Sequence, residues 1–564
     1  MNKKLPLLLS LTVFSFLTSL AQIVNLEHAA IRSETSVLES SASERHNNSD
    51  APHTAAIQFD SSNLPIVYIR TNWQSIGDEP KITAEMGIID NGYNQTNYVT
   101  DTPNDYDGLI GIERRGSISQ LWPQKSYSVE TRDSAGNSLN VSLLGMPSEN
   151  DWILYGPFDD RTMMRNVMTY QLGREMGYWA PRTYYVELVI NTYGFPEYQG
   201  VYVLMEKIKR DNDRVNISKL DSTENSGDDL TGGYIFAIDK NIWANDSGFY
   251  SSNPQNLFFT YKYPGANEIT QPQKDYLKAY VDSFETAMAA PNFDDLNNGF
   301  RKYAYEQSFM DYFFFTEMSK NIDAYKRSSY FYKDKYSDGG KLHCGPLWDY
   351  NSAWYNIHYC GFDVDTGWAY PMTCWISSAP VPFWWEKMLE DSIYSRDLKC
   401  RWTTWRSTVL DTAHIFHIID SIADYIRPAA VRQYDEYNFT ETFQGQVDTL
   451  KWWIANRITW MDANMPGNCW NLSVSESQLP EEMFTVYPNP AGGELYIGFN
   501  FPANEKISIE IIDPFGKKVE NIPTKNYASG ENKITIGLSG LSSGVYFIHI
   551  VTESGSVTKR IIKM

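Results

Sequence analysis

The chain of 564 residues lacks several short motifs that are typical of enzymes. It has no Walker P-loop and no G-x-G-x-x-G loop, so no local motif indicates a nucleotide-binding loop. It has no G-x-S-x-G elbow with a suitable His partner, which excludes a serine hydrolase. No C-x-x-C pair occurs, and His414 and His417 fall in a helical pattern, where histidines usually belong to the core or the surface. A zinc site is therefore not expected.

Basic residues are outnumbered by acidic ones, 48 Lys and Arg against 69 Asp and Glu, which gives a formal net charge of −21. This balance excludes a nucleic-acid partner held by a basic surface, because phosphate backbones attract positive charge. Aromatic residues are frequent, with 17 Trp and 38 Tyr. Such rings serve either as core or as platforms that stack on sugars, and composition leaves both roles open.

Long apolar runs are confined to the N-terminus. Residues 1–21 have the pattern of a secretory signal peptide, with Lys3-Lys4, an apolar stretch and a small-residue cleavage site. A membrane anchor is the alternative, but the run is short and interrupted by Ser and Thr. We therefore expect an exported chain with no transmembrane segment after cleavage. Residues 22–57, rich in Ser, Glu, Asn and Ala, are expected to form a flexible linker.

Cysteine is scarce, and export would permit these few residues to form disulfide bonds. Cys360 and Cys374 flank a 13-residue loop, and Cys400 and Cys469 flank a helical block, so we expect these two pairs. The sequence alone leaves the connectivity open. Because there are five cysteines, including Cys344, at least one thiol must stay unpaired within the chain.

Hydrophobic patterns divide the remaining chain into three regions. Residues 58–240 alternate as strands do, residues 270–470 are mainly helical in spacing, and residues 480–564 are short strands between Gly-rich turns. The patterns predict an α+β fold followed by a small all-β domain. By pattern alone the last region is a β-sandwich binding module.

The stretch 317–352 holds two acidic residues on either side of a predicted hairpin. Asp323 follows a helical run, and Asp349 follows the second of two short strands separated by the turn at 337–340. A hairpin would bring both carboxylates to the same end of a two-stranded ribbon. Phosphoryl transfer needs one carboxylate near the attacking hydroxyl and another holding the metal. The alternative is that Asp323 caps a turn and Asp349 pairs with an Arg.

Two sequence segments of this stretch resemble the CotH kinase family. They are N-I-D-A-Y-K-R-S-S-Y-F-Y at 321–332 and G-P-L-W-D-Y-N at 345–351. The resemblance covers about residues 60–470 and implies an atypical protein-kinase-like domain at 58–470. Its β-rich small lobe would occupy about 58–240 and its helical large lobe about 270–470. The implied cofactors are ATP and Mg²⁺ or Mn²⁺, and the implied partner is an acceptor protein phosphorylated on Ser or Thr.

The resemblance also implies roles for single residues. Asp323 would position the acceptor hydroxyl, and Asp349 would hold the metal. Lys125, in P-Q-K-S-Y at 123–127, would contact phosphate, and Glu206, which closes G-V-Y-V-L-M-E, would anchor that Lys. The alternatives are an exposed Lys on a strand and a salt bridge at a sheet edge.

Two further residues come from D-R-T-M-M-R-N at 160–166, a segment that resembles a family motif beside the nucleotide cleft. Arg165 and Asn166 would orient phosphates or acidic side chains there, and packing between the lobes is the alternative. Asp160 or Thr162 is expected to cap the helix that begins in this segment.

The sequence departs from the kinase pattern at two positions. Ser328 stands where a kinase-like catalytic loop has an Asn as second metal ligand, although Ser328, Ser329 or Asn351 could supply an oxygen. Gln124 replaces a second Lys before Lys125. Both departures favour a non-catalytic surface adhesin or scaffold that keeps the fold. A carbohydrate-active enzyme that uses the same acids is a third hypothesis.

Residues 480–564 resemble the C-terminal sorting domain of the type IX secretion system of Bacteroidota. The resemblance rests on F-T-V-Y-P-N-P at 484–490, I-I-D-P-F-G-K at 511–517 and L-S-S-G-V-Y-F at 541–547. It implies an immunoglobulin-like sandwich and export across the outer membrane by the type IX machinery. The mature protein would then be attached to the cell surface or released.

Overall fold

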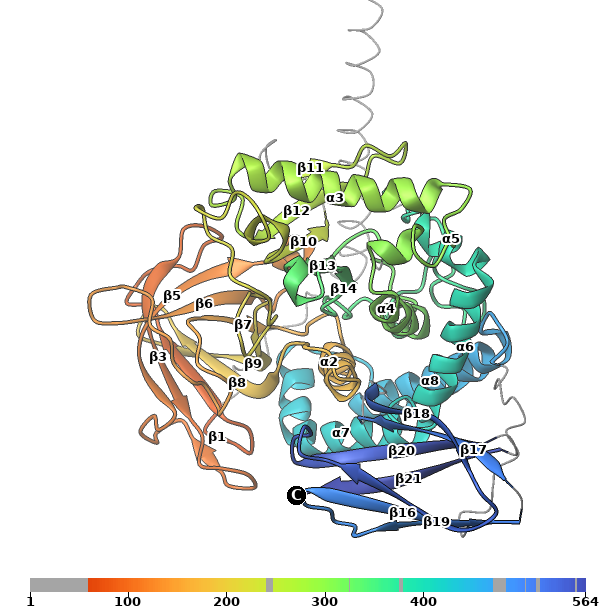
Figure 1. Ribbon diagram of the computed structural model, residues 1–564. Coiled ribbons are helices and arrows are strands. Elements are labelled where there is room, and N and C mark those ends of the chain that lie inside the picture. Colours follow the sequence, from red (N-terminus) through yellow and green to blue (C-terminus); the bar gives the residue numbers. More distant parts are fainter. Residues whose placement is uncertain are drawn as a thin grey trace, which may run out of the picture. The chain divides into compact units, whose positions relative to one another are not determined.

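A computed structural model of the protein describes residues 59–239, 247–323, 325–374, 379–469, 483–502, 504–513, 518–552 and 555–564 (Figure 1). The signal peptide and linker expected within 1–57 lie outside these residues. The chain divides into two compact units, Met1–Asn468 and Cys469–Met564. The first mixes helices and strands, and the second is all-β in its described part, as the sequence predicts.

A closed barrel forms the N-terminal part of the first unit. Its strands follow one another in the order β2-β3-β5-β6-β7-β9-β8, and β8 pairs in parallel with β2 to close it. They are β2 (Ile66–Arg70), β3 (Ile82–Ile89), β5 (Tyr106–Arg115), β6 (Ser126–Arg132), β7 (Asp151–Tyr155), β8 (Thr183–Asn191) and β9 (Pro196–Glu206), and the small pair β1 (Ser61–Ser62) and β4 (Asn97–Tyr98) lies outside it. Alternate residues such as Val67 and Ile69 pack into one interior cluster. The other face of each strand therefore points out of the barrel.

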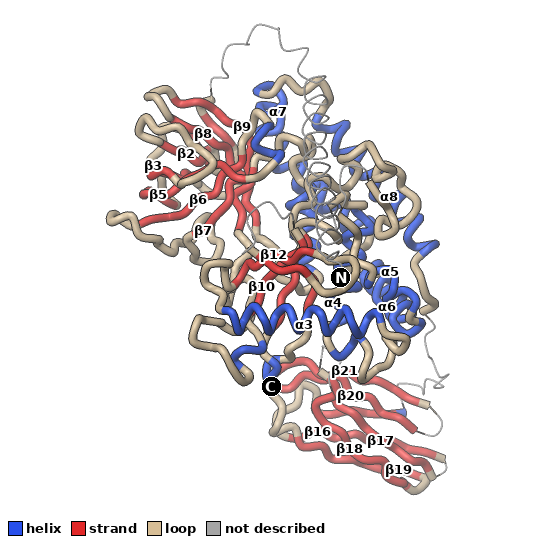
Figure 2. The backbone as a smooth tube through the Cα atoms, turned by 90° about the horizontal axis from the view of Figure 1, so that it is seen from above, coloured by secondary structure: helices blue, strands red, loops and turns tan. Residues whose placement is uncertain are grey.

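A five-stranded sheet in the order β11-β12-β10-β13-β14 follows the barrel. Its strands are β10 (Tyr234–Ile238), β11 (Gly248–Tyr250), β12 (Phe258–Tyr263), β13 (Ser329–Lys333) and β14 (Leu342–Cys344). The last two pair antiparallel, with Phe331 opposite Cys344, so the predicted hairpin is confirmed. In Figures 1 and 2 this sheet lies between the barrel and helix α3.

Helices fill the rest of the first unit, and several begin where the sequence supplies a capping residue. They are α2 (Arg165–Glu175), α3 (Gln271–Ala289), α4 (Glu306–Ser319), α5 (Trp384–Glu390), α6 (Ser392–Arg406), α7 (Thr412–Glu436) and α8 (Phe443–Asn464). The Asp391 and Asp411 side chains accept backbone N–H bonds at the starts of α6 and α7. No helix among the described residues has both the length and the apolar character needed to cross a membrane.

Contacts between α7 and the barrel join the two parts of the first unit. The amide of Gln433 donates to the Gln124 side chain at 3.0 Å, and Gln124 donates to the Val201 carbonyl at 2.8 Å. Arg432 binds the buried Glu187 carboxylate on β8. Gln124, which stands where the family often has a Lys, is thus a buried structural residue that holds β9 and α7 together.

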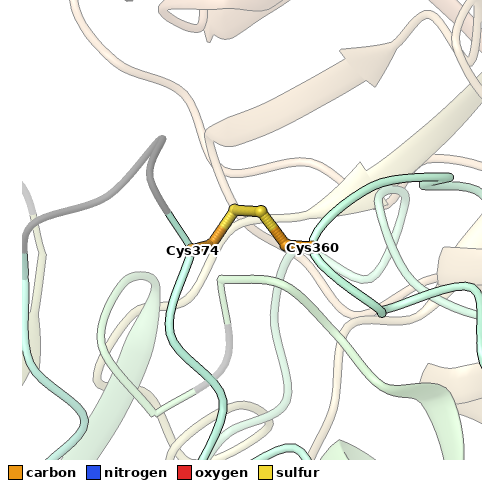
Figure 3. Close-up of a disulfide and its surroundings, with 2 residues drawn as sticks. All are labelled: Cys360 and Cys374. Atoms are coloured by element: carbon orange, nitrogen blue, oxygen red, sulfur yellow. A yellow bond between two sulfur atoms is a disulfide. The ribbon is translucent and has the colours of Figure 1, made fainter.

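One disulfide joins Cys360 to Cys374, with their Cα atoms 5.4 Å apart, as the sequence predicts (Figure 3). Cys374 belongs to a small hydrophobic cluster that also contains Ile322 and Phe362. Cys400 and Cys469 are also disulfide-bonded, and Cys344 is a buried free thiol. The odd cysteine is therefore the one on β14.

The second unit contains two antiparallel sheets that share one hydrophobic cluster. The first has the order β15-β16-β19, and the second β18-β17-β20-β21. The strands are β15 (Phe484–Tyr487), β16 (Glu494–Phe501), β17 (Glu505–Ile512), β18 (Lys518–Tyr527), β19 (Gly530–Gly537), β20 (Gly544–Thr552) and β21 (Ser556–Lys563). Leu495 and Ile497 from one sheet and Ile509 and Ile548 from the other are fully or almost fully buried in this core.

Candidate functional site

The β13–β14 hairpin brings the two predicted acids to one end of the ribbon. Asp323 lies in the loop that connects α4 to β13, and Asp349 lies in the loop after β14. Asn321 links the two loops. Its side-chain amide donates to the Asp349 carbonyl at 3.1 Å, and its side-chain oxygen accepts from the Asp323 backbone N–H at 3.1 Å.

Asp349 has an unusual backbone conformation and is held by neighbours on two segments, the loop before β13 and helix α2. Its φ of 65° lies in the left-handed region, which costs free energy for a residue other than Gly. The Ser328 hydroxyl donates to its carboxylate at 3.1 Å, and its backbone N–H donates to the Tyr170 hydroxyl at 3.1 Å. The Ser328 contact orients the carboxylate, and the Tyr170 contact holds the backbone.

Negative charge gathers around Asp349. Burial raises the pKa of its carboxyl group to about 6, and the nearby carboxylates of Asp323, Asp239 and Asp159 add to the rise, while the Ser328 hydrogen bond opposes it. The Asp323 carboxylate is the first of these neighbours to raise the pKa of Asp349 after burial. A carboxylate cluster of this kind is stabilised when a cation joins it.

Two basic residues that the sequence analysis did not select face the same cluster. Arg115, at the end of β5, lies over the Trp348 ring at 5.8 Å, and its pKa is lowered by burial although Tyr330 and Asp349 counteract this. Lys262 on β12 binds Asp239 at 3.2 Å. The sequence feature that could have identified Arg115 is the pair of Arg residues before Gly116, at the end of a predicted strand.

Side chains of helix α2 hold the Asp349 loop in position. The Asn166 side-chain oxygen accepts the Tyr350 backbone N–H at 2.7 Å. Arg165 is 1% exposed and forms an ion pair with Asp160, which is equally buried. Asp160 also accepts the Arg165 backbone N–H at 2.9 Å, but the N-cap of α2 is Met164, so the prediction that Asp160 or Thr162 caps this helix is wrong. Arg165 and Asn166 thus have the packing and positioning contacts named as their alternative role.

The expected pair of Lys125 and Glu206 does not form. The Lys125 ammonium donates to the carbonyls of Gln120 and Trp122 in its own loop, and Glu206 binds Arg182 at 2.7 Å. Glu206 is level with Val129 on the neighbouring strands, because both oppose Trp152. Lys125 comes four residues earlier than Val129, which is about 13 Å along a strand. The register of the barrel therefore separates the two side chains.

The donor set around Asp349 fits a hard divalent cation. Carboxylate and hydroxyl oxygens are the ligands that Mg²⁺ and Mn²⁺ prefer, and Asp349, Ser328 and Asp323 supply such oxygens. Among the described residues no group of three or more His, Cys, Asp or Glu side chains is arranged to hold a metal ion. The argument for such a cation thus rests on donor chemistry and on the Asp349 carboxyl group, whose pKa is raised by burial and by nearby carboxylates.

Comparisons with curated proteins and with solved structures do not support any role for this site. No curated protein matches the chain. Among solved structures, the Pseudomonas fluorescens alkylpurine DNA glycosylase AlkC bound to DNA containing an abasic site analog shares 9% identity. The match covers 32% of this chain and 72% of that chain with a TM-score of 0.11, which is too low to relate the folds.

Comparisons with protein families identify both parts of the chain. Residues 485–564 match the secretion system C-terminal sorting domain, which indicates secretion to the cell surface or the extracellular space by the type IX machinery. Residues 112–461, more than half of the chain, match the family described as CotH kinase protein. The matched segment contains both acidic loops, the hairpin between them and α2. The chain belongs to the CotH kinase protein family and carries a type IX secretion sorting domain.

Proposed function

We propose that this protein is a secreted, metal-dependent protein kinase that transfers phosphate from ATP to Ser or Thr residues of surface or secreted proteins. The observation that carries the proposal is the joint placement of Asp323 and Asp349. Two loops present their carboxylates at one end of the β13–β14 ribbon, and Asn321 ties the loops together. Phosphoryl transfer depends mainly on such positioning and on charge stabilisation.

In the proposed site each acid has its own role. Asp349, oriented by the Ser328 hydroxyl, would hold Mg²⁺ or Mn²⁺ together with oxygen from Ser328. When bound, the cation neutralises charge on the phosphates. Asp323, with 30% of its side chain exposed and Arg327 at 3.7 Å, would orient the acceptor hydroxyl. The barrel and the helical part would correspond to the small and large lobes of a kinase.

A role for Lys125 in phosphate contact requires it to leave the two carbonyls that it now binds. Burial lowers the pKa of Lys125, and the positive charge of Arg114 lowers it further. Arg115 is better placed for this contact, because it already interacts electrostatically with Asp349. We include Arg115 beside Lys125 as a phosphate-contacting residue in the proposal.

The test is phosphate transfer by the purified full chain with γ-labelled ATP, Mg²⁺ or Mn²⁺ and a general acceptor protein. We expect label transfer that is lost in Asp323→Asn and Asp349→Asn. Asp448→Asn, an exposed carboxylate on α8, is the matched control and should keep full transfer. Nucleotide binding is measured in parallel by calorimetry with and without the metal. The absence of both transfer and metal-dependent ATP binding would overturn the proposal.

A non-catalytic adhesin or scaffold on the cell surface is the second candidate. The engagement of Lys125 with backbone carbonyls favours it, because a kinase nucleotide Lys is normally paired with a carboxylate. If this candidate is correct, the folded chain transfers no phosphate. The Asp349→Asn variant then binds the acceptor protein with the same affinity as the parent.

A further inference from the structure

The outward face of the barrel holds a groove that is separate from the acidic site. It has a volume of about 330 Å³. Its lining residues come mainly from four adjacent strands, β3, β2, β8 and β9, whose places in the barrel are seen in Figure 2. In one row across these strands Gly87, Tyr68, Val189 and Tyr198 lie side by side in register. All four residues line the groove.

Aromatic faces dominate one end of the groove. Phe59 stacks on Tyr198 with ring centroids 4.6 Å apart and an angle of 22° between the rings. The Arg70 guanidinium lies 4.9 Å from the centre of the Tyr68 ring. Three aromatic rings thus line a single concave surface, and Tyr198, at 9% exposed, is the buried member that supports Phe59. Phe59 and Tyr68 are the partly exposed rings that a ligand can contact.

An exposed aromatic platform continues the groove at its other end. It consists of Trp73, Tyr193 and Phe195, which are 71%, 50% and 77% exposed. Trp73 follows β2, and Tyr193 and Phe195 form the tip of the β8–β9 hairpin next to Pro196, which lines the groove. The Trp73 backbone N–H donates to the Thr192 carbonyl at 3.0 Å. Large apolar side chains gathered on a surface in this way mark a binding site.

Charge in the groove excludes several classes of ligand. Glu85, Asp101 and Asp107 face a single cation, Arg70, among the lining residues. Arg70 and Glu85 are paired only loosely, at 3.8 Å. The excess of carboxylates repels phosphate, sulfate and uronic acid groups, which excludes nucleic acids and acidic glycans.

Closure of the barrel excludes a peptide bound as an added strand. All strands from β2 to β9 in the barrel have a partner on each side, so the groove floor has no free edge to pair with an extended peptide. The ligand must instead be recognised by side chains. Those available are aromatic faces, carboxylate acceptors and the Arg70 donor.

We propose that this groove and platform bind a neutral carbohydrate chain. A sugar ring has an apolar face of C–H groups that stacks on an aromatic ring, and its hydroxyls both donate and accept hydrogen bonds. The groove supplies the partly exposed Tyr68 and Phe59 for stacking, Asp101 and Asp107 as acceptors, and Arg70 as a donor. A protein that is secreted to the cell surface would meet such chains there, and the site would hold it on a glycan independently of phosphate transfer.

The experiment measures binding of the full chain to linear hexasaccharides of glucose, mannose and N-acetylglucosamine, with a heparin hexasaccharide as the anionic probe. Binding is followed by calorimetry and by tryptophan fluorescence. We expect at least one neutral hexasaccharide to bind, and heparin not to bind. Trp73→Ala and Tyr68→Ala should weaken binding at least about fivefold, because each removes a stacking ring.

Trp452→Ala is the matched control, since Trp452 is 52% exposed on α8, away from the barrel strands that form the groove. It should bind like the parent. The melting temperature of each variant checks its fold, and the exposed Trp73 variant remains decisive if Tyr68→Ala unfolds. The proposal is overturned if no neutral hexasaccharide binds, if heparin alone binds, or if the Trp73 variant binds as tightly as Trp452→Ala.

Discussion

The side chain of Asn321 hydrogen-bonds to the backbone carbonyl of Asp349, 28 residues away in the sequence, at 3.1 Å. Through its oxygen it also holds the backbone N–H of Asp323. One buried amide therefore sets the relative position of the two loops that carry the acidic residues. The geometry of the proposed catalytic pair depends on this residue without its touching either carboxylate.

Replacing Asn321 by Ala should reduce phosphate transfer about a hundredfold, because a small displacement of reacting groups has effects of this size. The loss should appear in the transfer rate more than in the affinity for ATP. Asn297→Ala, an exposed position, is the control and should leave transfer unchanged. Equal rates in the Asn321 and Asn297 variants would show that the amide does not position the acids.

Glu285 on α3 should make stability depend on pH. Burial raises its pKa from 4.5 to about 7, and the Ser251 hydroxyl opposes this. Between these pH values the folded chain keeps a proton that the unfolded chain has lost, so the free energy of unfolding falls as pH rises, by about 3 kcal/mol. In Glu285→Gln this contribution should be lost, so that the fall becomes smaller by about this amount, while other carboxyl groups with raised pKa values, such as Asp349, keep theirs.

Urea unfolding at pH 5 and pH 8 measures the effect. Tryptophan fluorescence is a suitable signal for the first unit, because the sequence has no Trp after position 470. Glu441→Gln, an exposed position, is the matched control and should keep the parent's pH dependence. A Glu285→Gln variant with the parent's slope would contradict the prediction.

Asp160→Asn should destabilise the first unit by about 3–5 kcal/mol. Asp160 and Arg165 are each 1% exposed, and removing one partner leaves the other charge buried and unpaired. The control is Asp424→Asn, which breaks the exposed pair with Arg427 on α7 and should cost at most about 1 kcal/mol. Urea unfolding followed by tryptophan fluorescence compares the two, and equal costs would refute the structural role of the buried pair.

Replacing both Cys360 and Cys374 by Ser should lower the free energy of unfolding by about 2–3 kcal/mol, as expected for a bridge that closes a loop of this length. Because Cys374 packs in one cluster with Ile322, which precedes Asp323, phosphate transfer should fall as well. The control is the single variant Cys344→Ser, which breaks no bridge and should not affect the 360–374 loop. Unchanged stability in the double variant would show that the cluster alone holds the loop.

Several features of the fold could be predicted from sequence because their causes are local. The helix pattern at 305–318 corresponds to α4, and the β-branched and aromatic residues around the turn at 337–340 correspond to the β13–β14 hairpin. The acids at either end of that hairpin were therefore found by sequence alone. The family and the secretion sorting domain were also identified from sequence motifs.

The tertiary structure decided which side chains meet. The register of the barrel separates Lys125 from Glu206, and the packing of α2 buries Arg165 against Asp160. Arg115 reaches the Asp349 region from a strand more than 200 residues earlier in the chain. Periodicity reports which face of an element is apolar, but the partner of that face depends on long-range packing. The sequence by itself thus determined the elements, the acids and the family, and only the fold determined the partners of each charged group and the aromatic groove on the barrel.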